Sequence, residues 1–394
     1  MWKKIVALAI CLVVLVFAGC GGNSNINQSS LDKADIEQEK KIYNGYTWGA
    51  LEQKGKDDDV YCNLPENVNG LDNMLLVCHD PKYDILYYVN YGVDYLIYGC
   101  RDGETEKIAD IPAKRLFCRD GKLYFIAESY GMDSLDGLDG QIFEYDPVTG
   151  QILTIMEEQV TSMMVYQDGI YCTIDEMKEL GDGSFLLDRV VKYYSFFDEK
   201  MIVLQDISGV VRTLYRCGQD FLFYVIGSYQ GEDEELLKMA EYGKEINSYI
   251  GMKLGDLNMM NEKALDNLLV LNDFYATDDK IYYVQNMEND ADFVVYSIDS
   301  KLESRYPLSS LEQGAYIVFD DCAYFSDLTG IDLKNGKQLE FFADEYCDIL
   351  EWYSDGVNLY GLCNILRDGD IISCIRKIEI QAGHIQFIPL TEAI

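Results

Sequence analysis

Histidine is nearly absent from this chain of 394 residues, which contains only His79 and His384. Ser-His-Asp and Cys-His catalytic systems each need a histidine within hydrogen-bonding distance of the nucleophile and of an orienting group. Two histidines so far apart in the sequence argue against that chemistry, and they also argue against a histidine-rich metal site. We expect both to be surface residues near strand ends.

Sequence signatures of zinc, redox and nucleotide sites are also missing. The 12 cysteines include no C-x-x-C pair, so the usual spacing for structural zinc and for thioredoxin-like chemistry is absent. No G-x-x-x-x-G-K-[ST] motif occurs, which removes the P-loop pattern. The chain has only 6 prolines, as is typical of long β-sheets.

Basic residues are few, and the formal net charge is −36 at pH 7. An excess of negative charge this large repels phosphate backbones and anionic lipid headgroups. We therefore expect no nucleic-acid binding. The charge favours neutral sugars, cations or basic protein surfaces as partners, although plain solubility at an exposed surface also accounts for it.

The first 20 residues have the pattern of an export signal. Two lysines precede an apolar run over 5–16, which is shorter than the roughly 20 residues that a membrane-spanning helix needs. The run ends in Phe17-Ala18-Gly19-Cys20. This ending resembles the lipobox of bacterial lipoproteins, with Phe17 in place of the usual Leu, Val or Ile.

The lipobox resemblance implies that Cys20 is diacylated and becomes the mature N-terminus. Residues 1–19 are then the signal peptide, and the polar residues 20–41 are the lipidated cysteine and a flexible tether. Because two acyl chains anchor a protein stably, we expect the chain to lie at the extracytoplasmic face of the cell membrane and to contact it through the lipid. An ordinary secretory signal with a chance cysteine is the alternative.

Ten cysteines remain after Cys11 and Cys20 are set aside. Several lie inside strand-like runs, such as Leu76-Val77-Cys78 and Leu116-Phe117-Cys118. Cysteine packs as a small hydrophobic residue in such places, so we expect most of these thiols to be free and buried. A few disulfides remain open, because exported proteins often contain them.

One pattern recurs along the rest of the chain: an apolar run, a turn containing aspartate, and an apolar-aromatic run. Asp and Gly suit tight hairpin turns, so each copy predicts a β-hairpin. The seven copies are centred on Asp84, Asp120, Asp168, Asp220, Asp279, Asp321 and Asp355.

A second hairpin follows most of the first ones, and the clearest runs from Gln141 to Leu153 through Pro147 and Gly150. Two hairpins make a four-stranded sheet, and repetition every roughly 40–50 residues is typical of β-propeller blades. We therefore predict an all-β propeller over residues 74–394 with about seven four-stranded blades, six or eight being the neighbouring possibilities. Residues 42–73 are irregular and are expected to pack on the propeller or close it.

The strand Ala323-Tyr324-Phe325-Ser326-Asp327 resembles the Tyr-Trp-Thr-Asp strand of lipoprotein-receptor-type (YWTD-like) propellers. The runs Ile281-Tyr282-Tyr283-Val284 and Leu86-Tyr87-Tyr88-Val89 are looser copies. Together with the N-terminus, the chain resembles bacterial surface lipoproteins that carry such propeller domains of unknown function. The resemblance implies a fold rather than an activity, because propellers host unrelated functions.

Two local features suggest further properties. The fourth repeat is longer than the others, and the acidic, helix-forming composition of 232–242 predicts a small helical insertion within 229–265. An inert loop and a lid over a binding site are both open readings of this insertion. Calcium is the one cofactor that the sequence suggests, and its candidate ligands are Asp133, Asp136 and Asp139, although a polar hairpin loop is the simpler explanation of these residues.

These observations favour a lipid-anchored, extracytoplasmic binding or scaffolding protein. We expect it to be non-catalytic and to recognise a protein or a glycan through one propeller face. The alternative is a carboxylate- or calcium-dependent hydrolase or lyase that acts on saccharides or lactones in the propeller channel. The sequence names no catalytic residue for that alternative.

Overall fold

The computed structural model divides the chain into two units, Met1–Glu39 and Lys40–Ile394. It describes residues of the second unit only, and these contain strands, turns and bends but no helix. No helix capable of crossing a membrane therefore occurs in this part of the chain. The described ranges are 41–54, 62–63, 75–130, 137–179, 185–203, 210–217, 220–226, 250–255, 263–264, 274–276, 279–286, 291–297, 299–308, 314–367 and 369–390.

The strands of the described residues are short, as expected for hairpins joined by tight turns. Their bounds are β1 Ile42–Asn44, β2 Cys62–Asn63, β3 Val77–Asp80, β4 Ile85–Val89, β5 Ile97–Arg101, β6 Glu104–Lys107, β7 Ala113–Arg119, β8 Lys122–Ala127, β9 Ile142–Tyr145, β10 Gln151–Met156, β11 Val160–Val165, β12 Gly169–Glu179, β13 Phe185–Ser195, β14 Lys200–Val203, β15 Val210–Cys217, β16 Asp220–Ile226, β17 Ile250–Gly255, β18 Lys263–Ala264, β19 Phe274–Ala276, β20 Lys280–Asn286, β21 Ala291–Ser297, β22 Glu303–Pro307, β23 Tyr316–Phe319, β24 Cys322–Phe325, β25 Thr329–Asp332, β26 Lys337–Glu340, β27 Phe342–Ala343, β28 Cys347–Ser354, β29 Leu359–Arg367, β30 Asp370–Gln381 and β31 His384–Pro389.

These strands form seven sheets, and each sheet contains four consecutive antiparallel strands. In chain order, the first sheet is β3–β6, the second β7–β10, the third β11–β14, the fourth β15–β18, the fifth β19–β22, the sixth β23–β26 and the seventh β28–β31. Three short strands extend two of them: β1 and β2 flank the second sheet, and β27 pairs in parallel with β31. The predicted all-β propeller class is confirmed by this repeated up-and-down order.

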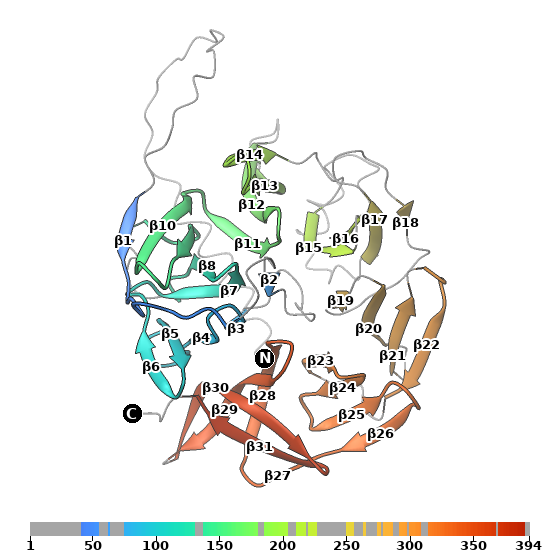
Figure 1. Ribbon diagram of the computed structural model, residues 1–394. Coiled ribbons are helices and arrows are strands. Elements are labelled where there is room, and N and C mark those ends of the chain that lie inside the picture. The colour runs from blue at the N-terminus through green and yellow to red at the C-terminus, as the bar shows by residue number, and fades with distance from the viewer. Residues whose placement is uncertain are drawn as a thin grey trace. The chain divides into compact units, whose positions relative to one another are not determined.

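Neighbouring sheets contact one another mainly through their first strands (Figure 1). Strand β3 contacts β7, β7 contacts β11, β15 contacts β19, and β23 contacts β28. Strand β28 of the seventh sheet also contacts β3 of the first. The end of the repeat array therefore meets its beginning without exchanging strands in the described residues.

The N-terminal strands lie on the second sheet. Strand β1 pairs with β10, the last strand of that sheet, and β2 pairs with β7, the first. The tyrosine hydroxyl of Tyr145 donates a hydrogen bond to the backbone oxygen of Tyr46 at 2.8 Å, which ties the segment after β1 to β9. Residues 42–54 thus lie along the second sheet and also bond to the first, because the backbone N–H groups of Tyr46 and Lys54 donate to the oxygens of Ile108 and Lys82. In the described residues they form no strand pairing with the seventh sheet.

Each of the seven predicted aspartates lies at the turn between the first and second strand of a sheet. Asp120 and Gly121 both have positive φ, 51° and 76°, as a two-residue hairpin turn with matching twist requires. Asp355 instead stabilises its turn through the side chain, which accepts hydrogen bonds from the backbone N–H groups of Val357 and Asn358. The aspartate therefore recurs because it stabilises the hairpin turns.

One glycine of the repeat has a different function from the one its sequence suggests. Gly169 does not have positive φ; a Cβ at this position would overlap the backbone oxygen of Tyr194 and the ring of Tyr193. Close approach between β12 and β13 requires glycine there.

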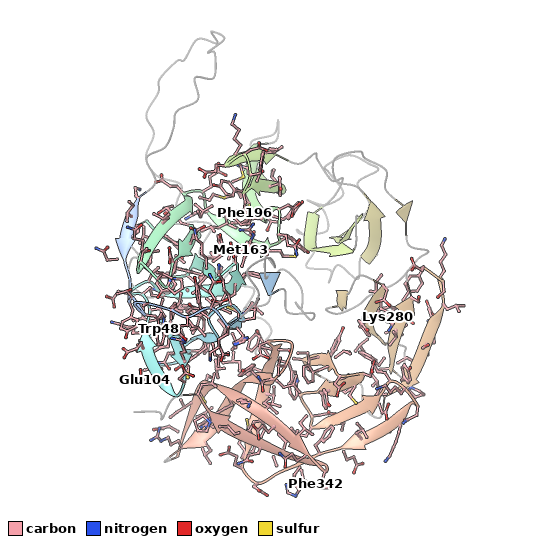
Figure 2. All side chains as sticks on the ribbon, in the orientation of Figure 1. Trp48, Glu104, Met163, Phe196, Lys280 and Phe342 are labelled. Carbon is pink, nitrogen blue, oxygen red and sulfur yellow. The ribbon has the colours of Figure 1, made fainter. Side chains whose placement is uncertain are left out.

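The core lies between the sheets, whose described side chains are drawn in Figure 2. Most of its aromatic side chains come from second and third strands, but Phe117, Tyr316 and Tyr353 come from first strands. Phe293 of the fifth sheet and Phe325 of the sixth meet edge to face, with ring centroids 5.6 Å apart. Burial on both faces explains why signature strands such as β8 are apolar almost without alternation. Arg115 is an exception: it is fully buried in β7 with φ of 55°, and its guanidinium donates to the backbone oxygen of Met163 at 3.5 Å.

The predicted insertion of the fourth repeat is described only in part. Within 229–265, Ile250–Gly255 and Lys263–Ala264 are strands β17 and β18 of the fourth sheet. The helix expected over 232–242 lies outside the described residues.

Candidate binding face

The up-and-down strand order separates the connections of every sheet into two sets. Turns between first and second strands, and between third and fourth strands, lie at one edge of the sheets, which we call the turn face. Connections between second and third strands, and between successive sheets, lie at the opposite edge, which we call the loop face. Binding residues concentrate on longer connections held by a rigid scaffold, so the loop face is the candidate site.

Tight turns and ion pairs occupy the turn face. Lys54 and His79 both contact Asp84, with Nζ–Oδ2 and Nε2–Oδ1 distances of 2.6 and 2.9 Å. Lys82 of the first sheet pairs with Asp120 of the second at 2.8 Å. These ion pairs join neighbouring turns to one another, and the charged side chains of the turns are therefore paired with each other.

The loop face carries a cluster of three half-buried tyrosines, which we call the tyrosine knot: Tyr91, Tyr95 and Tyr130. The first two lie in the β4–β5 connection and the third follows β8. Tyr95 and Tyr130 stack with centroids 4.5 Å apart, and Tyr91 meets both rings edge to face. The knot therefore fixes the loop of the first sheet against the loop of the second.

Carboxylates surround the tyrosine knot. The Tyr130 hydroxyl donates to the backbone oxygen of Ala113 at 2.8 Å, and burial, reinforced by Glu128 and Glu351, raises the pKa of Tyr130 well above its ordinary value. Glu128 pairs with Lys114, and Glu351 accepts a hydrogen bond of 2.8 Å from the Tyr353 hydroxyl. The hydroxyl of Tyr130 is consequently a permanent donor that holds its loop in place.

Large apolar side chains project into solvent at the loop-face end of the seventh sheet. Leu366 and Ile371 are direct cross-strand partners at the β29–β30 connection, and their exposed fractions are 61% and 70%. Tyr346 precedes β28, whose first residue pairs with Ile365, and it is 70% exposed. We call Tyr346, Leu366 and Ile371 the apolar edge.

The loop of the first sheet packs directly on the hairpin that carries the apolar edge. A Cβ on Gly92 would overlap the backbone oxygen of Ser373, so only glycine allows this approach. Val93, the next residue, is largely exposed. The first and seventh sheets thus present exposed apolar groups from connections that are in contact.

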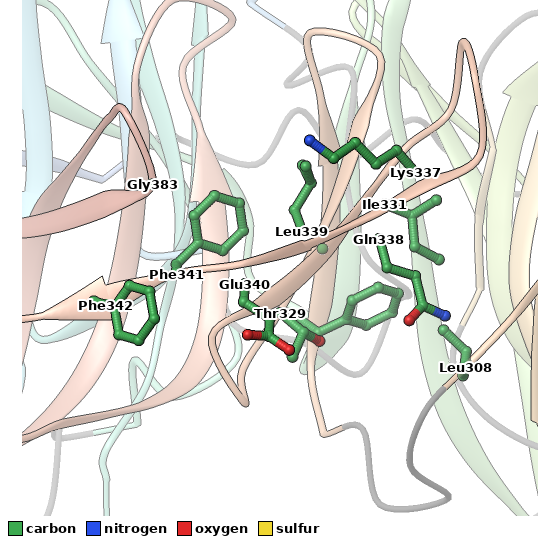
Figure 3. Close-up of a pocket in the computed structure, with 12 residues that line it drawn as sticks. Leu308, Thr329, Ile331, Lys337, Gln338, Leu339, Glu340, Phe341, Phe342 and Gly383 are labelled. Atoms are coloured by element: carbon green, nitrogen blue, oxygen red, sulfur yellow. The ribbon is translucent and has the colours of Figure 1, made fainter.

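A pocket of about 570 Å³ opens at the outer strands of the sixth sheet (Figure 3). Its wall combines the aromatic rings of Phe325, Phe341 and Phe342 with the side chains of Lys337 and Glu340. The other polar groups are already used: Gln338 donates its amide to the backbone oxygen of Pro307 at 2.8 Å, and Thr329 donates its hydroxyl to Asp327 at 2.6 Å. The pocket is lined mainly by the third and fourth strands of the sixth sheet, together with Phe325 of its second strand, and it contains none of the residues that the sequence proposed for lipidation or for a metal.

Of the residues that the sequence proposed for sites, the structure describes only Asp139. Cys20, Asp133 and Asp136 lie outside the described residues. Asp139 accepts a hydrogen bond of 2.8 Å from the backbone N–H of Ser129, which is a loop contact. Within the part of the chain that the structure describes, no group of three or more possible metal ligands occurs.

The two histidines belong to different sheets. His79 lies in β3 beside Asp84, and the Nδ1 atom of His384, in β31, lies 3.8 Å from Oδ1 of Asp344. Neither the tyrosine knot nor the apolar edge was foreseen from the sequence, because their members come from connections without periodicity. The exposed pair Leu366 and Ile371, which lies on both sides of Arg367-Asp-Gly-Asp370, is the one signal that could have indicated a hairpin with an apolar tip.

Comparison with known proteins adds little beyond this geometry. The sequence matches no family model and no curated protein. Among solved structures, it is similar to the Pyrococcus horikoshii acylaminoacyl peptidase at 12% identity over 82% of this chain, with a TM-score of 0.49. The chain spans 53% of the length of that peptidase.

Two further solved structures show the same level of similarity. YjhT is 8% identical over 68% of this chain and 94% of its own, with a TM-score of 0.42. A chain of the nidogen/laminin complex is 9% identical over 66% of this chain and 87% of its own, with a TM-score of 0.35. At these values we base the fold on the strand order alone.

Proposed function

We propose that this chain is a lipid-anchored, extracytoplasmic binding protein without catalytic activity, and that it recognises a protein partner through the loop face. The apolar edge is the observation that carries the proposal. Three large, exposed apolar side chains gathered at the end of one sheet are typical of an interaction site, whereas isolated ones are ordinary surface residues.

The surroundings of the apolar edge suit a preformed binding surface. The tyrosine knot and the Gly92–Ser373 contact hold the β4–β5 loop in one position. Binding then costs little loop ordering, which favours affinity. The net charge of −36 further favours a basic partner, because complementary charge steers association.

A glycan is the second class of ligand that a propeller face can bind. Sugar recognition by aromatic rings needs open ring faces, but the rings of Tyr95 and Tyr130 are stacked on each other. Tyr346 is 70% exposed, but its exposed neighbours in the apolar edge are the aliphatic Leu366 and Ile371, and this combination favours a protein over a glycan.

The proposal is tested by chemical crosslinking in intact cells, followed by affinity capture of the tagged chain and mass spectrometry. Leu366→Asp and Ile371→Asp each place a charge on the apolar edge. Phe197→Asp is the matched control, because Phe197 is 94% exposed and lies in the β13–β14 turn on the turn face.

We expect one protein to be recovered near stoichiometry with the wild type and with Phe197→Asp. Recovery falls about tenfold or more with either loop-face variant, as for residues central to an interface. Equal recovery from all four forms contradicts the use of the apolar edge. If no protein is enriched and the tagged chain is retained on immobilised glycans, the ligand is a glycan and not a protein.

A further inference from the structure

Two buried cysteine side chains from neighbouring sheets point at each other. The sulfur atoms of Cys78, in β3, and Cys118, in β7, are 3.1 Å apart, and both residues are 1% exposed. For comparison, the sulfur of Cys172 is also buried, but its neighbour is the thioether of Met156 at 3.9 Å.

The two strands that carry the pair are held against each other. Strands β3 and β7 are in contact, and the backbone N–H of Leu116 donates to the oxygen of Leu75 at 2.8 Å, close to both cysteines. A disulfide has an S–S length of roughly 2.0 Å, so the sulfurs need to approach by only about 1 Å. Side-chain rotation supplies such a movement without displacing a strand.

We propose that Cys78 and Cys118 form a disulfide in the exported protein and link the first sheet covalently to the second. The inference rests on the export proposed above and is independent of the apolar edge. It changes the expectation from the sequence, which treated these two thiols as free.

The oxidant is a disulfide, carried by a thiol–disulfide oxidoreductase or by a small molecule. The thiolate of one cysteine attacks a sulfur of that disulfide, forms a mixed disulfide and releases one thiolate. The second cysteine, after losing its proton, attacks the first and displaces the other thiolate. Two protein thiols are thereby oxidised to one disulfide, and their two protons end on the partner disulfide, which is reduced to two thiols.

Because both sulfur atoms are buried in the folded protein, the exchange must occur before folding is complete. An attacking thiolate must be accessible, and both sulfurs are enclosed once the first two sheets have packed. The bond therefore forms during folding, after export, and the folded protein resists both late oxidation and reduction.

The test uses two preparations of the full chain. One is extracted from the membrane fraction of cells without reductant, with free thiols alkylated during lysis; the other is reduced, unfolded and refolded in a glutathione disulfide buffer. Non-reducing tryptic digestion and mass spectrometry then search for a link between the peptides 57–82 and 116–119. Peptide 57–82 also contains Cys62, so the Cys62→Ser variant assigns the bond to Cys78.

We expect the linked peptide pair, lighter by two hydrogen atoms than the sum of the reduced peptides, in both preparations and in the Cys62→Ser and Cys172→Ala variants. Cys118→Ala leaves Cys78 open to alkylation after unfolding. Wild-type protein that is reduced while unfolded and then refolded with reductant should have a Tm about 5 °C below that of the oxidised form, since the bond closes a loop of about 40 residues. The Tm of the Cys78→Ala/Cys118→Ala double variant should not change on reduction.

Free Cys78 and Cys118 in both preparations overturn the proposal. A bond in the refolded protein alone supports the pairing and counts against export instead. Loss of the link in the Cys62→Ser variant also overturns it, because the bond then belongs to Cys62.

Discussion

Asp80 provides the sharpest test of how burial controls stability in this fold. It is the last residue of β3 and is 1% exposed. Its Oδ1 atom accepts a hydrogen bond of 3.0 Å from the backbone N–H of Lys82, whereas Oδ2 has no hydrogen-bond partner among the described residues. Desolvation raises the pKa of Asp80 from 3.8 to about 6, against the opposing effect of the Lys82 hydrogen bond and of the charge on His79.

The sign of the effect follows from proton binding. Between about pH 4 and pH 6 the folded protein holds the Asp80 proton while the unfolded chain has lost it, so the free energy of unfolding falls as the pH rises through this window. A shift of about two pKa units corresponds to about 3 kcal/mol once both states are ionised. Ionised Asp80 therefore destabilises the fold at pH 7.

The Asp80→Asn variant retains an acceptor for Lys82 and carries no charge. We expect it to be more stable than the wild type at pH 7 by about 1–3 kcal/mol. The difference between variant and wild type should grow by about 1 kcal/mol from pH 5 to pH 7, because part of the titration lies in that interval. Urea unfolding at several pH values measures both quantities, and groups common to the two proteins cancel in the difference.

Asp321→Asn is the control. The hydrogen bond from Lys334 lowers the pKa of Asp321, so its titration lies below pH 5 in both states and the difference from wild type stays constant from pH 5 to pH 7. The reasoning fails if Asp80→Asn is less stable than the wild type at pH 7 and its difference does not change with pH.

Four further results are expected. Arg115→Ala should lower the free energy of unfolding by about 2–4 kcal/mol in denaturant titration, because it empties a buried site and removes a donor to Met163; a change below 0.5 kcal/mol would contradict this. Gly169→Ala should destabilise the protein more than Gly356→Ala, because a Cβ on Gly169 meets backbone whereas a Cβ on Gly356, at φ of 85°, meets open space. Thermal unfolding ranks the two variants. The reverse order would contradict the close approach of β12 and β13. Asp355→Ala should lower the free energy of unfolding by about 1–3 kcal/mol, because the Asp355 side chain accepts four hydrogen bonds, including one of 2.8 Å from the Tyr360 hydroxyl. Asp355→Asn should restore part of this stability. Equal stability of the two variants would argue against the turn contact. Val93→Asp should leave the Tm unchanged, as an exposed residue, while reducing partner capture as Ile371→Asp does; unchanged capture excludes the first-sheet loop from the binding surface.

The hairpins could be predicted because their information is local. Asp120-Gly121 and Asp355-Gly356 each stand between apolar runs, and turn chemistry acts over two to four residues. Repetition of that unit then indicates a propeller, because a four-stranded sheet with two apolar faces needs neighbours on both sides.

Contacts that depend on how one sheet lies against the next could not be predicted from the sequence. The contact of Cys78 with Cys118 requires β3 and β7 to lie in one register, which no local pattern encodes. The same holds for Arg115, which looks like the polar end of an apolar run but is buried between the second and third sheets.

The candidate site was the least predictable part. Tyr91, Tyr95 and Tyr130 lie in connections without periodicity, and they meet only because two sheets pack together. Strand β1 has three residues, and its pairing with β10 follows from tertiary contact rather than from propensity.

Lipidation of Cys20 is the central claim about where the protein lies in the cell. Partner recognition at the cell surface and disulfide formation after export both depend on it. Metabolic labelling with a tagged fatty acid, followed by fractionation, compares the wild type with Cys20→Ala. We predict labelled wild-type protein of mature size in the membrane fraction, and an unlabelled Cys20→Ala chain that keeps its signal segment. Equal labelling of both forms, or wild-type protein of mature size in the membrane fraction without label, would contradict the lipid anchor.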